Sequence, residues 1–458
     1  MNGLLYRRLF QKSCRGELMN ISIKSFYIDG YRNISNFTLN MQDVTAIIAL
    51  NNYGKSNLIN AIRMGVDFIK GSNDIKASIF EYMPAYPFLS VSSGKNFTFG
   101  VVMQMIDEIS NTVYKIDYRY SFKWRTKSSE GAIDEECLRI TAKGIAGGNV
   151  IVRNKDASVC SFRASLKTRN KRRLIIKDNS LAINALINIV DDDETFLKIL
   201  NELNNIKFSI EDHLDANESY DFDPIQYRGA KSINVPRLIW DMKEKHPDEY
   251  EMLIDSFKQL FPNIVEIHCQ EHPINHSDKS ISNIDPNILF NDSIYTLSVK
   301  DPSFTRPISF NYLSDGTKRV FLTLVTAVTA SINQLSVLAL EEPENSIHPK
   351  LLQSYISILD TLSGDCKLIF TSHSPYIIQC IDPQSIIIGL PSKSGQADFR
   401  YISKPLKIVE DAYIDGCSLG DFIFGCLSFE NAADILEEYL SDSQTVSNDE
   451  VNEDEKND

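Results

Sequence analysis

The tripeptide Gly54-Lys55-Ser56 combines residue types that bind a phosphate chain. A lysine amine reaches the β and γ oxygens, a serine hydroxyl ligates Mg²⁺, and backbone N–H groups at a helix N-terminus face the phosphates. The flanking residues predict the elements that would position this loop. The apolar run Val44–Leu50 indicates a buried strand, and residues 57–63 have the apolar spacing of a helix packed on it. We therefore predict a nucleotide-binding loop between strand and helix.

Two residues depart from the usual phosphate-loop pattern G-x-x-x-x-G-K-[ST]. Ala49 stands at the first glycine, and Tyr53 is bulky where a small residue is common. Alanine fits that position only with a negative φ, because its Cβ disfavours the left-handed region. We expect a working loop with reduced nucleotide affinity.

An acidic pair follows another apolar run. Glu341 and Glu342 end the predicted strand Val337–Glu341, and the carboxyl ends of strands are where open α/β sheets bind ligands. Adjacent side chains there diverge, so one carboxylate can hold Mg²⁺ while the other orients a water. The alternative is a solvated acidic turn.

Three further features have both a functional and a structural interpretation. Ser314 and Gly316 begin a predicted helix, where they form either an anion site or an ordinary helix cap. His373 ends the predicted strand Cys366–Thr371, either near the γ-phosphate or simply packed. Arg32 contacts phosphate or adenine, or else lies in a surface turn.

Composition indicates a globular protein. The 458 residues are 43% hydrophobic and 24% charged, and the net charge of −14 gives no overall basic footprint for nucleic acid. The eight cysteines form no C-x-x-C pair, which is typical of a reducing, cytoplasmic environment. No apolar stretch is long enough for a membrane span, and the basic start lacks the apolar core of a signal peptide.

The order of patterns predicts an α/β protein in which two halves of a nucleotide fold flank an insertion. Residues 97–124 alternate apolar and polar, which predicts an antiparallel ribbon. Segments of helical pattern occur at Leu181–Val190, Asp193–Asn205 and Pro236–Leu260. The expected divisions are an N-terminal extension (1–18), a first lobe with the nucleotide-binding loop and the ribbon (19–124), a polar and helical insertion (125–270), a second lobe (271–440) and an acidic, disordered tail (441–458).

In this order the motifs resemble those of ABC-type ATPases of the overcoming-lysogenization-defect (OLD), RecF and SMC-like group. The segment ALNNYGKSNLINAI is similar to the group's Walker A, LSDGTKR to its signature loop, LEEPENSIHP to its Walker B and D-loop, and FTSHSP to its switch-histidine loop. Good similarity covers about residues 20–70 and 230–400. The resemblance implies an ABC-type ATPase head with a mixed sheet, an antiparallel β lobe and a mostly helical insertion.

The resemblance also implies residue roles. Ser56 and Glu341 hold Mg²⁺, Glu342 polarises water, His373 senses the γ-phosphate, and Ser314 with Gly316 act in trans on ATP bound by a second subunit. Gln104 is a candidate for the glutamine loop. The residues expected to bind ATP are Asn51, Asn52, Gly54, Lys55, Ser56, Asn57, Arg32, Ser314 and Gly316.

Too few residues follow His373 for the Toprim nuclease domain that many OLD-type proteins carry. We therefore expect a slow, oligomeric ATPase that scaffolds or regulates a separate effector, a nuclease, as in phage-defence operons of the Septu, retron-associated and PARIS types. One alternative is a RecF-like DNA-binding ATPase, and another is a scaffold for which ATP is structural. The DNA alternative depends on a basic run that is otherwise a solvated loop, formed by Lys167, Arg169, Lys171, Arg172 and Arg173.

Overall fold

The computed structural model describes most of the chain. The described residues are 19–89, 94–127, 130–145, 147–155, 158–190, 193–211, 225–227, 235–273, 288–290, 293–345, 347–392 and 394–442. The expected N-terminal extension and all but the first two residues of the expected acidic tail lie outside them. None of the described helices is long and apolar enough to cross a membrane.

The chain divides into two compact units. The first comprises Met1–Ile210, Leu335–Glu342 and Cys366–Asp458, and the second comprises Glu211–Gln334 and Pro343–Asp365. The segment 125–270, grouped above as one insertion, is thus shared between the units. The predicted Walker A loop, the acidic pair and His373 all belong to the first unit.

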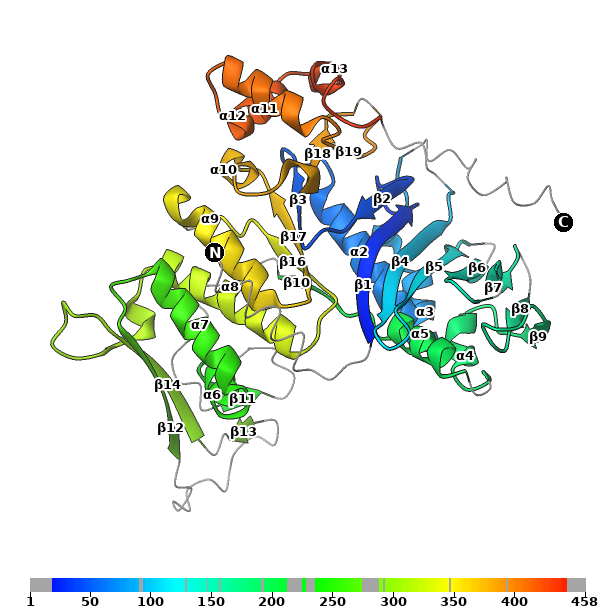
Figure 1. Ribbon diagram of the computed structural model, residues 1–458, viewed down its shortest axis with the longest axis horizontal. Coiled ribbons are helices and arrows are strands. Elements are labelled where there is room, and N and C mark those ends of the chain that lie inside the picture. The colour runs from blue at the N-terminus through cyan, green and yellow to red at the C-terminus, as the bar shows by residue number, and fades with distance from the viewer. Residues whose placement is uncertain are drawn as a thin grey trace. The chain divides into compact units, whose positions relative to one another are not determined.

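A six-stranded mixed sheet forms the centre of the first unit (Figure 1). Its core strands β3, β16, β17 and β18 are almost entirely buried, as expected for parallel strands covered on both faces. Pairing is parallel between β16 and β17, β17 and β3, and β3 and β18, whereas β19 is antiparallel to β18. The strand order is β10 (Phe208–Glu211), β16 (Val337–Glu341), β17 (Lys367–Ser372), β3 (Val44–Ile48), β18 (Ile386–Leu390) and β19 (Asp398–Tyr401).

This order brings three distant segments to one edge of the sheet. Glu341 pairs with Thr371 on β17, and Ser372 pairs with Ile48 on β3. Because parallel strands end at the same edge, the segments after β3, β16 and β17 emerge together there. The two predicted halves of the chain thus contribute strands to one sheet, with β3 from the first half paired with β17 and β18 from the second.

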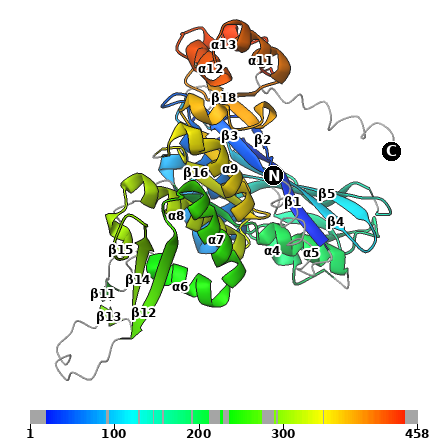
Figure 2. The same ribbon diagram turned by 60° about the vertical axis from the view of Figure 1, so that its left-hand side comes forward.

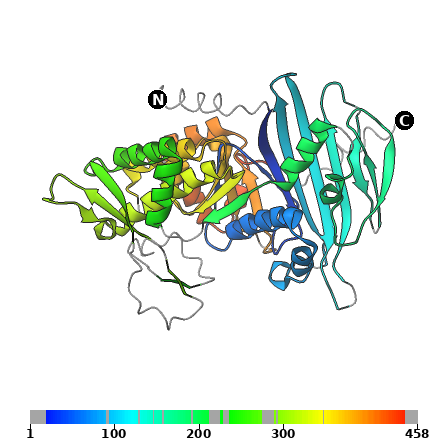
Figure 3. The same cartoon turned by 90° about the horizontal axis from the view of Figure 1, so that it is seen from below.

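An eight-stranded antiparallel sheet forms the rest of the first unit's framework, with its blue-to-teal strands side by side in Figure 3. The predicted ribbon at 97–124 is β4 and β5, but four more strands of this sheet follow within the segment assigned to the polar insertion. Their polar positions alternate with buried ones, which lowered the apolar signal of the sequence. The order is β2 (Phe37–Asn40), β1 (Met19–Asp29), β4 (Phe97–Asp107), β5 (Thr112–Lys123), β6 (Ala132–Thr141), β7 (Asn149–Arg153), β8 (Val159–Arg163) and β9 (Lys171–Ile175).

Helix α2 (Lys55–Lys70) packs closely on this second sheet. The ring of Phe68 stacks on Tyr120 and Phe122, with centroids 5.1 and 4.8 Å apart. A Cβ on Gly65 would lie 2.1 Å from the ring of Phe99, so only glycine permits this approach. The Tyr120 hydroxyl donates to the Gly65 carbonyl at 2.8 Å. These contacts fix the helix whose first turn carries the residues predicted to bind phosphate.

A buried carboxylate joins the sheet to α4 (Ala182–Leu186), which precedes α5 (Glu194–Asn204). Glu136 accepts hydrogen bonds from the N–H groups of Ala182 (2.6 Å) and Ile183 (3.1 Å) and from the Tyr118 hydroxyl (3.0 Å). Burial raises the pKa of Glu136, and these donors oppose that rise. The carboxylate therefore fastens the N-terminus of α4 to β6.

The second unit is mainly helical, with a β ribbon at one end (Figure 2). Phe257, Phe310 and Phe321 form its aromatic core, with Phe257–Phe321 and Phe310–Phe321 centroids 4.9 and 4.7 Å apart. The predicted helical stretch 236–260 is present as two helices. The elements are β11 (Ile225–Tyr227), α6 (Val235–Lys245), α7 (Pro247–Leu260), β12 (Glu266–Pro273), β13 (Ile288–Phe290), β14 (Ser293–Lys300), β15 (Ile308–Ser309), η3 (Phe310–Tyr312), α8 (Asp315–Ile332) and α9 (Pro349–Ser363).

The remaining elements are short. Helix α3 (Asn73–Phe80) and η1 (Met83–Ala85) follow α2, while α10 (Pro375–Ile378) and η4 (Pro383–Ser385) lie between β17 and β18. The helices after β19 are α11 (Pro405–Ile414), α12 (Leu419–Leu427) and α13 (Ala432–Leu436).

Candidate nucleotide-binding site

The loop between β3 and α2 has the backbone of a phosphate cradle. Gly54 is the N-cap of α2 with φ 97°, and Asn52 also has a positive φ, of 69°. A Cβ on Gly54 would lie 3.1–3.3 Å from Ala397 and Asn33, so the position needs glycine for conformation and for space. Ala49 is not among the described residues of positive φ and is fully buried, which meets the condition set by its replacement of glycine.

The Lys55 ammonium lies over the loop. It donates to the carbonyls of Ala49 at 2.6 Å and Leu50 at 3.1 Å. The side chain is half-buried, so the charge is held next to the N-terminal amides of α2. Both lysine and amides attract an anion.

Ser56 and Glu341 are in direct contact. The Ser56 hydroxyl donates to Glu341 Oε1 at 2.9 Å, although the residues are 285 positions apart. Two oxygen ligands at octahedral Mg²⁺ are separated by about 3 Å, given metal–oxygen distances of about 2.1 Å. The pair is thus spaced as adjacent ligands of such an ion.

Glu342 turns away from Glu341 and contacts His373. Its φ of 49° is unusual for a non-glycine residue, and its N–H donates to the Thr371 carbonyl at 2.8 Å. One Glu342 carboxylate oxygen lies 2.7 Å from His373 Nδ1, and both side chains are partly exposed. Backbone strain of this kind concentrates at functional sites. The two adjacent carboxylates therefore have different partners, as the sequence predicted.

Arg32 reaches the first turn of α2 through a relay. Its guanidinium donates to Asn57 Oδ1 at 2.7 Å and to the Pro84 carbonyl at 2.8 Å. The Asn57 amide donates to Asn33 Oδ1 at 2.7 Å. Asn33 was not identified from sequence, since an asparagine in a short turn has no distinguishing pattern. Arg32 thus lies beside the loop, and its direct contact with a nucleotide remains a prediction.

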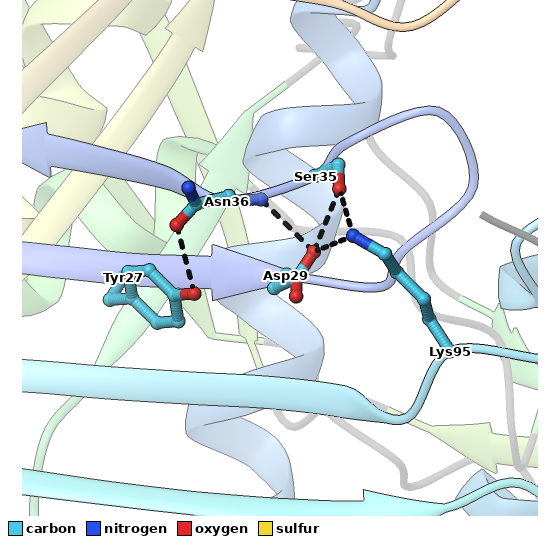
Figure 4. Close-up of polar contacts among 5 residues, drawn as sticks. All are labelled: Tyr27, Asp29, Ser35, Asn36 and Lys95. Carbon is cyan, nitrogen blue, oxygen red and sulfur yellow. Dashed lines mark hydrogen bonds and ion pairs between the residues drawn. The ribbon is translucent and has the colours of Figure 1, made fainter. Parts of the chain in front are cut away.

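Hydrogen bonds and an ion pair around Asp29 stabilise the turn that carries Arg32 (Figure 4). Asp29 accepts hydrogen bonds from the Ser35 hydroxyl at 2.9 Å and the Asn36 N–H at 3.0 Å, and Lys95 lies 3.4 Å from the same oxygen. Tyr27 donates to the Asn36 side chain at 3.1 Å. These contacts hold the β1–β2 turn in one conformation, which preorganises Arg32 and Asn33.

The second unit carries the predicted signature loop. Ser314 is the N-cap of α8, and its hydroxyl accepts the Thr317 N–H at 3.2 Å. Ser314 is exposed, and Gly316 lies in the first helical turn. The structure thus shows Ser314 as a helix cap, and anion binding by this loop stays a prediction.

Other predicted residues differ in their placement. Asn51 and Asn52 are exposed in the turn before Gly54. Gln104 lies within β4, paired with Ser22 and Lys115, which corrects its assignment to a glutamine loop. The basic run is only partly a loop, because its last three basic residues form the exposed edge strand β9.

Solved structures that match this chain include heads of SMC proteins and RecF. The SMC head domain from Thermotoga maritima matches 83% of this chain and 99% of its own, with 12% identity and a TM-score of 0.40. An Smc head domain with an extended coiled coil, bound to the C-terminal domain of ScpA derived from Pyrococcus furiosus, matches 86% and 99%, with 10% identity and a TM-score of 0.43. The recombination mediator protein RecF matches 83% and 98%, with 15% identity and a TM-score of 0.35.

The curated proteins searched contain no match to the sequence. A family model does match, over residues 44–379, which include β3, the acidic pair and His373. It is described as "AAA domain, putative AbiEii toxin, Type IV TA system". The match spans most of the chain, so this protein belongs to that AAA domain family.

Proposed function

We propose that the protein binds and hydrolyses ATP with Mg²⁺ at the loop 49–56. The observation that carries the proposal is the 2.9 Å contact between Ser56 and Glu341, which joins the loop to the acidic strand end. The donor set fits the ion, because Mg²⁺ prefers hard oxygen ligands. Bound there, Mg²⁺ would neutralise phosphate charge.

The phosphate chain would be held by the Lys55 ammonium and the first amides of α2. In the described structure Lys55 is engaged by two loop carbonyls, so nucleotide binding exchanges these partners for phosphate oxygens. Gly54 supports phosphate binding by this loop. A side chain at this position would contact Asn33 and Ala397, so the glycine keeps the loop in its present conformation.

Glu342 is the proposed general base. Its contact with His373 orients the carboxylate, which accepts a proton from the attacking water. Because His373 contacts Glu342, the position of the His373 ring is coupled to the position of the Glu342 carboxylate in this proposal. Ser314 and Gly316 complete the site in trans in this proposal, so an isolated subunit hydrolyses slowly.

The proposed role of the ATPase is to regulate a separate effector, a nuclease, in bacterial phage defence. The proposal is supported by the resemblance of the motifs to those of phage-defence ATPase subunits, while the family description names a putative toxin of a TA system. Purification with and without the neighbouring gene product tests this role. Failure to co-purify, together with unchanged phage sensitivity on deletion, would exclude it.

The ATPase itself is tested by comparing wild type with Glu342→Gln. We expect measurable ATP hydrolysis that falls by about 10²–10³-fold in the variant while nucleotide binding persists. Glu410→Gln, at an exposed position on α11, is the matched control. Equal, residual turnover in both proteins would favour the alternative in which ATP is a structural ligand of a scaffold.

A RecF-like DNA-binding function is a second candidate, favoured by the exposed basic strand β9 at a sheet edge. Lysine and arginine on an edge also prevent strand-to-strand aggregation, which is the structural alternative. DNA-stimulated hydrolysis that weakens steeply with salt and is lost on charge reversal of Arg169, Lys171, Arg172 and Arg173 would support DNA binding. Charge reversal of Lys404, just before α11, and of Lys407, on α11, is the control.

A further inference from the structure

Ala49 and Gly389 lie side by side where β3 and β18 end. The two strands run parallel, with Ala46 opposite Ile386 and Ile48 opposite Ile388. Both residues are buried. A Cβ placed on Gly389 would lie 2.7 Å from the Cβ of Ala49, a distance that real Cβ contacts essentially never reach.

The crowding cannot be relieved by a side-chain rotation. The Ala49 methyl group is fixed to the backbone, so only a shift of the strand end makes room. The ring of Phe399 also faces Gly389, at 3.1 and 3.3 Å from the built Cβ. Two explanations for the glycine therefore compete: space for Ala49, or space for the Phe399 ring.

We propose that Gly389 is a positioning residue of the nucleotide loop, and that its missing side chain makes the room occupied by Ala49. In the usual pattern the small residue stands on the loop itself, at position 49. Here that space is provided from the neighbouring strand instead. The inference rests on the proposed nucleotide binding by the loop 49–56.

The functional consequence follows from the backbone hydrogen bonds that Ala49 makes. Its carbonyl accepts the Lys55 ammonium at 2.6 Å, and its N–H donates to the Ser372 carbonyl at 3.3 Å. Ser372 directly precedes His373. A displaced Ala49 would move the anchor of the phosphate-binding lysine and the connection to β17 together.

A double-mutant cycle separates the two explanations. The proteins are wild type, Ala49→Gly, Gly389→Ala and the double variant, and the readouts are affinity for a fluorescent ADP analogue with Mg²⁺ and the urea midpoint of unfolding. We expect Gly389→Ala to weaken nucleotide binding by about tenfold or more, and Ala49→Gly to restore most of that loss in the double variant. Gly425→Ala on α12, where a Cβ meets nothing within 4 Å, should bind as wild type does.

Each outcome of the double-mutant cycle either supports or overturns the proposed contact between Ala49 and Gly389. Recovery in the double variant supports the proposal, as does a double variant that folds when Gly389→Ala alone does not. Wild-type affinity in Gly389→Ala, or equal losses in the single and double variants, overturns it and leaves Phe399 as the reason for the glycine. If wild type itself binds no nucleotide, the proposed function fails, whereas coupling in the urea midpoints still tests the packing of Ala49 on Gly389.

Discussion

Ser56 on the first turn of α2 donates a hydrogen bond to Glu341 at the end of β16, across 285 positions of sequence and 2.9 Å of space. Both residues belong to the same compact unit. They meet because β17 lies between β16 and β3 and pairs in parallel with both. The sheet order therefore brings the hydroxyl of one motif to the carboxylate of another.

Glu341→Gln should uncouple nucleotide affinity from magnesium. In wild type we expect chelation of Mg²⁺ to weaken ATP binding strongly, since Ser56 and Glu341 are spaced as its ligands. In the variant an amide replaces the anionic ligand, so chelation should change the affinity little. Titration calorimetry with and without EDTA measures this. A strong magnesium dependence in the variant would place the ion elsewhere.

Lys55→Ala should weaken ATP binding by about 10- to 100-fold, because a charge-assisted contact to phosphate is lost. Lys70→Ala is the control, as Lys70 lies at the other end of the same helix. Fluorescent-nucleotide titration of both variants gives the comparison. Similar effects from the two lysines would contradict the specific role of Lys55.

Asn57→Ala should reduce nucleotide affinity about fivefold by releasing Arg32 from the first turn of α2. Arg32→Ala should produce a similar loss, and the double variant should lose little more, because both substitutions interrupt the same relay. The exposed Arg63→Ala on α2 serves as control. Additive losses would show that the two residues act independently.

Lys76 should make stability rise with alkaline pH. Burial lowers the pKa of this lysine to about 8, below its value in the unfolded chain, while its ammonium donates to Asn184 at 2.7 Å. Between pH 8 and about 10.5 the unfolded chain binds more protons. The free energy of unfolding should therefore rise by up to about 1.4 kcal/mol per pH unit.

Urea unfolding at several pH values, compared between wild type and Lys76→Met, isolates this contribution, since other alkaline titrations are common to both proteins. The difference in slope should be confined to the range above pH 8. Parallel curves would show that Lys76 keeps an ordinary pKa.

Glu136→Ala should destabilise the first unit by about 3 kcal/mol, because two backbone donors of α4 and the Tyr118 hydroxyl lose a buried acceptor. Glu135→Ala, on the exposed face of the same strand, should cost less than about 0.5 kcal/mol. Chemical denaturation followed by circular dichroism provides the values. Equal costs would mean that the carboxylate contributes no more than a surface residue.

Several secondary-structure elements could be predicted from sequence because a short local pattern of apolar and polar residues marks them. The strand Val337–Glu341 has the predicted bounds, since a short apolar run between polar turns marks a buried strand. The strands β6 to β9 were missed for the opposite reason. Half of their residues face away from the core, and charged side chains such as Arg139 interrupt the apolar pattern.

The sequence alone determined which residues are candidates for the chemistry, because a glycine-lysine-serine turn, an acidic pair and a strand-terminal histidine are each defined within a few adjacent positions. Only the tertiary structure decided how they meet. The contacts of Ser56 with Glu341, of Arg32 with Asn57 and of Ala49 with Gly389 depend on strand order and on pairing between distant segments. Those arrangements arise from burial of whole strands and helices, and no local pattern of residues encodes them.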